Sequence, residues 1–318
     1  MQSIDQSPFF SSDVIQHQEL RLIPIHTKLG EFNVWTHRIG HNPAIKVLLL
    51  AGGPGLSYDY LSAFDSYFPN QNIEYIYYDQ LGCGKSDNPM DDSLYSIERS
   101  VEELEQVRAA LNLTCENSYL YGHSWGGIVA MEYALKYQAN IKGLIISNMT
   151  FSGESYNQYI DHTLAPEIPQ SALNFIRELE ANNAFEDPLY MKLVADHFYV
   201  KHVCRMPMEK WPEPVMRSLG NINHSFYTLM QGPSEFGIKG NLKHWSIETR
   251  LANIEVPTLF VGAKYDTMNP RDVEWMSRKV KNGFYLFCPN GSHLALYDDQ
   301  AFYMAGLINF LKRVSGNQ

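Results

Sequence analysis

One pentapeptide, G-x-S-x-G at residues 122–126, constrains this chain more than any other feature because of what lies on either side of it. A short apolar strand is predicted over 118–121, and the apolar spacing of 125–137 is typical of a helix. A serine held on a tight strand-to-helix turn needs small neighbours, which glycine supplies at both flanks. The pattern therefore predicts a strand–turn–helix unit that presents Ser124 at the end of a strand.

The alternation of strands and helices extends over most of the chain. Apolar runs predict strands at 45–51, 73–78, 118–121, 141–147, 258–262 and 284–287, a hairpin at 21–27 and 32–38, and helices at 96–111, 125–137 and 302–312. Such alternation favours a mainly parallel sheet with helices on both faces, so the predicted fold class is α/β. Hydrophobic residues make up 45% of the 318 residues, enough for a large core.

One segment interrupts this rhythm. Residues 150–247 show no strand–helix alternation, and their helical patches at 172–182 and 188–202 predict an α-helical cap inserted between sheet strands. Such an insertion would cover the strand ends, where ligands bind in open α/β sheets. The predicted organisation is a flexible leader at 1–18, an α/β catalytic domain at 19–149 and 248–318, and a cap domain at 150–247.

Charge and cysteine content exclude several classes of protein. The formal net charge of −10 argues against nucleic-acid binding, since an acidic surface repels phosphates. The apolar runs are too short to span a membrane, and the first twenty residues lack the basic and apolar regions of a secretory signal. The four cysteines are scattered, and the histidines lack metal-ligand spacing. We therefore expect a cytoplasmic protein with reduced thiols and no metal site.

A nucleophilic serine needs a base, and the base needs an orienting acid. In the chain order serine, acid, histidine, two later strand ends supply the partners. Asp266 follows the strand predicted at 258–262, and His293 follows the one at 284–287. Most of the eleven histidines need have no role, and Asp266 could instead cap the helix that follows it. Their order and strand-end position nevertheless predict a catalytic triad with Ser124.

An acyl-transfer site also needs donors for the oxyanion. The backbone N–H of Trp125, directly after the candidate nucleophile, is one expected donor. The second should come from the loop Gly-Gly-Pro-Gly at 52–55, which follows the strand at 45–51. Of its residues we favour Gly53, although a plain Gly-Pro turn would give the same composition.

With these motifs together, the chain resembles the proline iminopeptidases of the α/β-hydrolase fold, including the tricorn-interacting aminopeptidase. The resemblance runs from about residue 22 to residue 311. It rests on the loop at 52–55, the Asp-Gln-x-Gly-x-Gly-x-Ser stretch at 79–86, the serine motif at 122–127, the Gly-Pro-x-Glu-Phe stretch at 232–236, and the loops of Asp266 and His293.

The resemblance implies cleavage of an N-terminal residue, typically proline, without metal or organic cofactor. It also implies that cap carboxylates hold the free amino terminus of a peptide or amino-acid amide. By motif these are Glu235 and Glu209. A prolyl ammonium has two N–H donors, which two carboxylates could accept as charge-assisted bonds. One position departs from the family pattern, because Ala51 stands where a histidine usually precedes the 52–55 loop.

Two other functions stay open at this stage. An amino-acid amidase or a small-molecule esterase would keep the triad without needing Glu235. A ligand-binding protein could also use the same scaffold with little turnover, because a fold does not fix a function.

Overall fold

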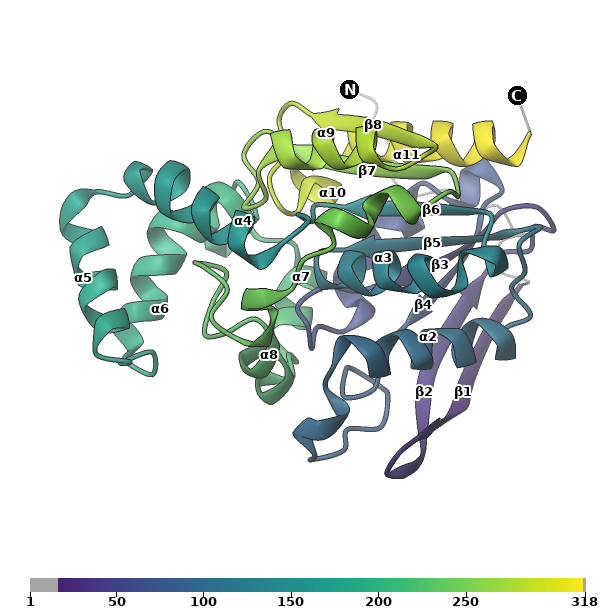
Figure 1. Ribbon diagram of the computed structural model, residues 1–318, viewed down its shortest axis with the longest axis horizontal. Coiled ribbons are helices and arrows are strands. Elements are labelled where there is room, and N and C mark those ends of the chain that lie inside the picture. The colour runs from purple at the N-terminus through teal and green to yellow at the C-terminus, as the bar shows by residue number, and fades with distance from the viewer. Residues whose placement is uncertain (1–16, 317–318) are drawn as a thin grey trace, which may run out of the picture.

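An eight-stranded sheet lies at the centre of the molecule (Figure 1). The computed structural model describes residues 17–316. The strands are β1 (Gln18–Thr27), β2 (Gly30–Ile39), β3 (Lys46–Leu50), β4 (Glu74–Tyr78), β5 (Ser118–His123), β6 (Gly143–Ser147), β7 (Thr258–Ala263) and β8 (Gly283–Cys288). Their order in the sheet is β1-β2-β4-β3-β5-β6-β7-β8. The β1–β2 hairpin is antiparallel and β2 is antiparallel to β4, whereas all other neighbours are parallel. The predicted α/β class is confirmed.

The central strands are buried on both faces because helices cover both. The core helices are α2 (Ile97–Ala110), α3 (Trp125–Tyr137), α9 (Pro270–Lys279), α10 (Ala295–Asp298) and α11 (Gln300–Ser315). In β3, Leu48 and Leu50 belong to the apolar core shared with α2, α3 and α9. Val47 and Leu49 point the other way and share a core with α11. This alternation follows from the two-residue period of a strand and explains the continuous apolar runs of the sequence.

Between β6 and β7 the chain forms helices that lie at one end of the sheet (Figure 1). They are α4 (Gly153–Tyr159), α5 (Gln170–Ala181), α6 (Pro188–Val194), α7 (Glu213–Gly220) and α8 (His224–Met230). Their buried side chains, such as Ile176 and Phe226, belong to the same apolar core as α3. Where the segment leaves and rejoins the sheet domain, Ser152 and Ser246 pair as an isolated antiparallel bridge. The division into domains with a cap at 150–247 stays a proposal.

Two expected elements differ from the structure. The expected helix at 188–202 is α6 followed by a π-helical stretch, Ala195–Val203, so the helical pattern continues but its hydrogen bonding changes. The flexible leader expected at 1–18 ends too late, because Gln18 already pairs with Ile39 in the β1–β2 hairpin. Residues 1–16 of that leader lie outside the described residues. Among the helices of residues 17–316, none is both long and apolar enough to cross a membrane.

The carboxyl ends of the parallel strands position the candidate site. Since β3, β5, β7 and β8 run in the same direction, the loops that follow them open at one edge of the sheet. These loops carry Gly53, Ser124, Asp266 and His293, respectively. Topology alone therefore gathers residues that are up to 240 positions apart in the sequence.

Candidate active site

Ser124 occupies a strained backbone position between β5 and α3. Its φ of 54° and ψ of −124° are unusual for a residue with a side chain. The flanking glycines are required by close approach: a Cβ on Gly122 would lie 2.2 Å from the Gly126 carbonyl oxygen, and one on Gly126 would lie 2.4 Å from the Leu50 oxygen. The Ser124 N–H donates to the Ser147 carbonyl at 3.0 Å. The turn thus holds the serine at the head of α3, as expected for a nucleophile elbow.

The structure brings Asp266 and His293 together. The distance between His293 Nδ1 and Asp266 Oδ1 is 2.8 Å, and both side chains are buried. The carboxylate also accepts the Asn148 amide at 2.7 Å and the Met268 N–H at 3.1 Å. Burial alone would lower the pKa of His293, but the Asp266 carboxylate outweighs it and raises that pKa above 6.5. The His293 imidazole is therefore suited to act as a base, because Asp266 would stabilise the imidazolium that forms when it accepts a proton.

Asn148 was missed in the sequence although a signal for it existed. It directly follows β6, so the strand-end rule that singled out Asp266 and His293 also applies to it. Its side-chain amide donates to both Asp266 and the Ser292 carbonyl, at 2.7 and 3.1 Å. Asn148 thus fixes the carboxylate relative to the loop that carries the histidine.

The loop at 52–55 lies directly against the nucleophile. A Cβ on Gly52 would approach the Ser124 Cβ to 2.9 Å, so only glycine fits there. Gly53 has a φ of +105°, and within residues 17–316 its N–H donates no hydrogen bond to the protein. The Trp125 N–H opens helix α3 and so has no intrahelical acceptor. Two backbone donors are therefore available beside Ser124, where a tetrahedral oxyanion would form.

The Asp-Gln-x-Gly-x-Gly-x-Ser stretch at 79–86 makes hydrogen bonds to the residue before this loop and to the residue after Ser124. Gln80 donates to the Ala51 carbonyl at 3.2 Å and accepts the Trp125 indole N–H at 3.0 Å. Asp79 accepts the N–H groups of Tyr58 and Lys85 at 2.7 and 2.9 Å. Burial, partly opposed by those donors, raises the pKa of Asp79 to about 6. The stretch thus organises the backbone around the site.

Glu235 approaches the same site from the helical segment. It follows α8 and is held by three tyrosine hydroxyls: Tyr227 donates to its Oε1 at 2.7 Å, Tyr156 donates to its backbone carbonyl at 2.6 Å, and Tyr199 accepts its N–H at 3.1 Å. Burial raises the pKa of Glu235, whereas the neighbouring His293 lowers it. The same carboxylate helps to raise the pKa of His293. Glu235 therefore lies within electrostatic range of both His293 and Asp266.

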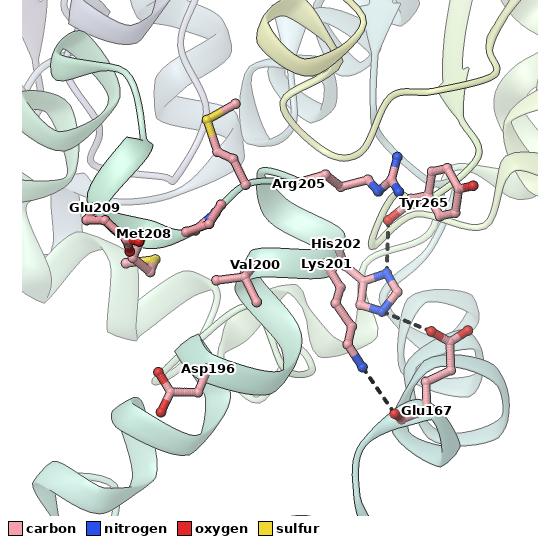
Figure 2. Close-up of a pocket in the computed structure, with 11 residues that line it drawn as sticks. Glu167, Asp196, Val200, Lys201, His202, Arg205, Met208, Glu209 and Tyr265 are labelled. Carbon is pink, nitrogen blue, oxygen red and sulfur yellow. Dashed lines mark hydrogen bonds and ion pairs between the residues drawn. The ribbon is translucent and has the colours of Figure 1, made fainter.

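Glu209 lies elsewhere. It is exposed in a short turn, Met208–Lys210, and lines a pocket of about 750 Å³. Figure 2 shows Glu209 beside Met208 on one side of this pocket, away from Tyr265 and Arg205. The other acidic groups of the pocket are Glu167 and Asp196, and Glu235 is not among its lining residues. The structure therefore does not place the two predicted cap carboxylates together.

The described residues hold no group of three or more histidine, cysteine or acidic side chains arranged to bind a metal ion.

Comparison with known proteins identifies the family. Residues 46–300 match the alpha/beta hydrolase fold model. Proline iminopeptidases from Chitinophaga pinensis and Flavobacterium johnsoniae are 52% and 51% identical, over 93% and 92% of this chain and 99% and 98% of theirs. The crystal structure of VinJ has a TM-score of 0.85 at 26% identity, covering 92% of this chain and 99% of its own. That of the Mycobacterium smegmatis proline iminopeptidase has a TM-score of 0.82 at 24% identity, covering 93% and 99%. The chain therefore belongs to the proline iminopeptidase family of α/β hydrolases, as its motifs indicate.

Proposed function

We propose that this protein is a serine aminopeptidase that removes an N-terminal residue, preferably proline, from small peptides with a free amino terminus. The observation that carries this proposal is Glu235, a carboxylate of the helical segment that is held by the Tyr227 and Tyr156 hydroxyls and lies within electrostatic range of His293. A general esterase has no need for a negative charge beside its catalytic base. A substrate ammonium does need one.

In the proposed reaction, Ser124 Oγ attacks the carbonyl carbon of the N-terminal residue. His293 accepts the hydroxyl proton and then gives it to the leaving amine, while Asp266 holds the imidazole by its Nδ1–H. The products of this half-reaction are an acyl-enzyme ester and a peptide shortened by one residue. Water, deprotonated by His293, then attacks the ester and regenerates Ser124.

The Gly53 and Trp125 N–H groups are proposed to donate hydrogen bonds to the carbonyl oxygen and so to stabilise the negative charge that develops on it. Removing one such donor typically costs about 2.7–4 kcal/mol in transition-state stabilisation. The chemistry requires no metal or organic cofactor, since base, nucleophile and oxyanion donors all come from the chain.

Glu235 would accept the substrate ammonium and so fix its distance from Ser124, which restricts cleavage to the first peptide bond. Glu209 is exposed and lines a pocket that Glu235 does not, so we propose that it adds at most a weak attraction of about 0–1 kcal/mol for the substrate ammonium, without a shared contact. A cytoplasmic location is also proposed. It is supported by four free cysteines, of which Cys83, Cys204 and Cys288 are buried.

The test is a panel of rates with Pro-, Ala- and Leu-p-nitroanilide, prolinamide and p-nitrophenyl acetate. We expect the highest kcat/KM on Pro-p-nitroanilide. A preference for prolinamide would point to an amidase, and a preference for p-nitrophenyl acetate would point to an esterase. No turnover of any substrate would point to a ligand-binding protein.

A further inference from the structure

A buried chain of hydrogen bonds joins the three loops of the site through two side chains that the reaction described above does not use. The Gly52 N–H donates to the Tyr60 hydroxyl at 2.6 Å. The same hydroxyl lies 3.0 Å from His123 Nδ1, and His123 Nε2 lies 2.8 Å from the His293 carbonyl oxygen. Tyr60 and His123 are 1% and 2% exposed, so water does not compete for these bonds.

The direction of each bond follows from its partners. A carbonyl oxygen only accepts, so His123 Nε2 must carry a proton to bond to His293. Burial lowers the pKa of His123 to about 3, which keeps the imidazole neutral and leaves its Nδ1 as an acceptor. The Tyr60 O–H therefore donates to Nδ1 while its oxygen accepts the Gly52 N–H. Each donor in this series of hydrogen bonds has one acceptor, and only the His123 tautomer with the proton on Nε2 allows all of the bonds to form.

These hydrogen bonds immobilise the Ala51–Gly52 peptide group, which directly precedes the Gly53 N–H proposed as an oxyanion donor. Gln80 holds the carbonyl of the Ala51–Gly52 peptide, and Tyr60 holds its N–H. With this peptide fixed at both ends, the next N–H along the chain is that of Gly53. Tyr60 thus determines which amide is left for the substrate oxygen. At the other end, His123 fixes the backbone of the residue that carries the catalytic imidazole.

We propose that Tyr60 and His123 are positioning residues that hold the oxyanion loop, the nucleophile turn and the His293 backbone in one geometry. The proposal deepens the proposed function and rests on it for the roles of Ser124, His293 and Gly53. Neither side chain need touch the substrate. Their effect should therefore fall on kcat and not on KM, and it should be the same for every acyl substrate.

The first test is Tyr60→Phe, which removes the hydroxyl and keeps the ring. Loss of a hydrogen bond that leaves the buried Gly52 N–H unpaired should lower kcat by about 10-fold or more, with little change in KM. The rate at which a fluorophosphonate labels Ser124 should fall by a similar factor. Tyr75→Phe is the matched control, since Tyr75 is equally buried and donates to Asp65 at 2.6 Å, near the C-terminal end of the same 3-10 helix, Tyr58–Ser66. It should cost stability without a loss of kcat.

The second test is His123→Gln, in which the amide N–H₂ can replace Nε2 toward His293, whereas the amide oxygen does not occupy the position from which Nδ1 accepts the Tyr60 hydroxyl. It breaks the same link as Tyr60→Phe, so the double variant should lose no more kcat than the worse single variant. His123→Gln also carries the test alone if Tyr60→Phe does not fold. If the kcat losses of the two single variants multiply in the double variant, Tyr60 and His123 act independently and the proposal is wrong. A kcat within twofold of wild type for either single variant would also contradict it.

Fluorophosphonate labelling separates this proposal from the proposed function. The reagent reports on the oxyanion site without any peptide specificity. If the wild type is labelled at Ser124 but does not cleave Pro-p-nitroanilide, the proposed aminopeptidase function is wrong. The effect of Tyr60→Phe on the labelling rate still tests whether Tyr60 and His123 position the oxyanion loop.

Discussion

Replacing Glu235 by glutamine distinguishes a peptidase from a general hydrolase. The substitution removes the charge and preserves shape. The glutamine oxygen can still accept the Tyr227 hydroxyl, and the 2.6 Å bond from Tyr156 goes to the backbone carbonyl and is unaffected. The local fold should therefore survive, and what changes is the ability to hold a substrate cation.

The magnitude follows from the kind of contact that is lost. A charge-assisted hydrogen bond to an ammonium contributes about 1.5–3 kcal/mol, or about 10–150-fold in kcat/KM. The thermal stability of the protein should rise or stay the same, although kcat/KM falls. Because burial raises the pKa of Glu235, the folded state disfavours its charged form, so a neutral glutamine should not lower the melting temperature.

The assay compares kcat/KM for Pro-p-nitroanilide and p-nitrophenyl acetate in the wild type and in Glu235→Gln. The loss should be confined to the substrate with a free ammonium. Glu180→Gln is a matched control in the same helical segment, where the glutamate pairs with Arg177 at 2.7 Å and Lys239 at 3.1 Å. It should lower the melting temperature and leave both rates normal. Equal losses on both substrates in Glu235→Gln, or no loss on either, would refute the assignment.

Three further outcomes are expected. The kcat/KM should fall as the pH drops through the pKa of His293, which lies above 6.5, because only the neutral imidazole accepts the serine proton; Asp266→Asn should lower turnover by about 10⁴ and move any residual acid limb to lower pH. Gly126→Ala should destabilise the fold by about 1–3 kcal/mol in thermal unfolding, since its Cβ would meet the Leu50 carbonyl at 2.4 Å, whereas Gly220→Ala, with nothing within 4 Å, should be neutral or stabilising. Glu209→Gln should change kcat/KM for Pro-p-nitroanilide by less than about fivefold.

The strands and the mainly parallel character of the sheet were predictable from the sequence. Apolar runs mark strands buried on both faces, and their ends carry the loops, so the neighbourhood of Ser124, Asp266 and His293 follows from topology. Local periodicity could not distinguish an α-helix from the π-helical stretch at Ala195–Val203, because both bury similar faces.

Contacts between distant segments were beyond the sequence patterns. The resemblance assigned the same role to Glu209 and Glu235, yet Glu209 is exposed beside a pocket and Glu235 is enclosed by tyrosines. Tyr60 lies in a 3-10 helix with no distinctive motif, and its bond to His123 depends on where that helix packs against the end of β5. Such juxtapositions require the three-dimensional arrangement of the chain.

The most direct test of the central claim compares Pro-p-nitroanilide with its N-acetylated counterpart. The two substrates have the same scissile bond and leaving group, and they differ in whether the amino group is charged. If Glu235 holds an ammonium beside the Ser124–His293–Asp266 site, kcat/KM for the acetylated substrate should be lower by about 100-fold or more. Equal kcat/KM for the two substrates would contradict an aminopeptidase and would leave an ordinary serine hydrolase.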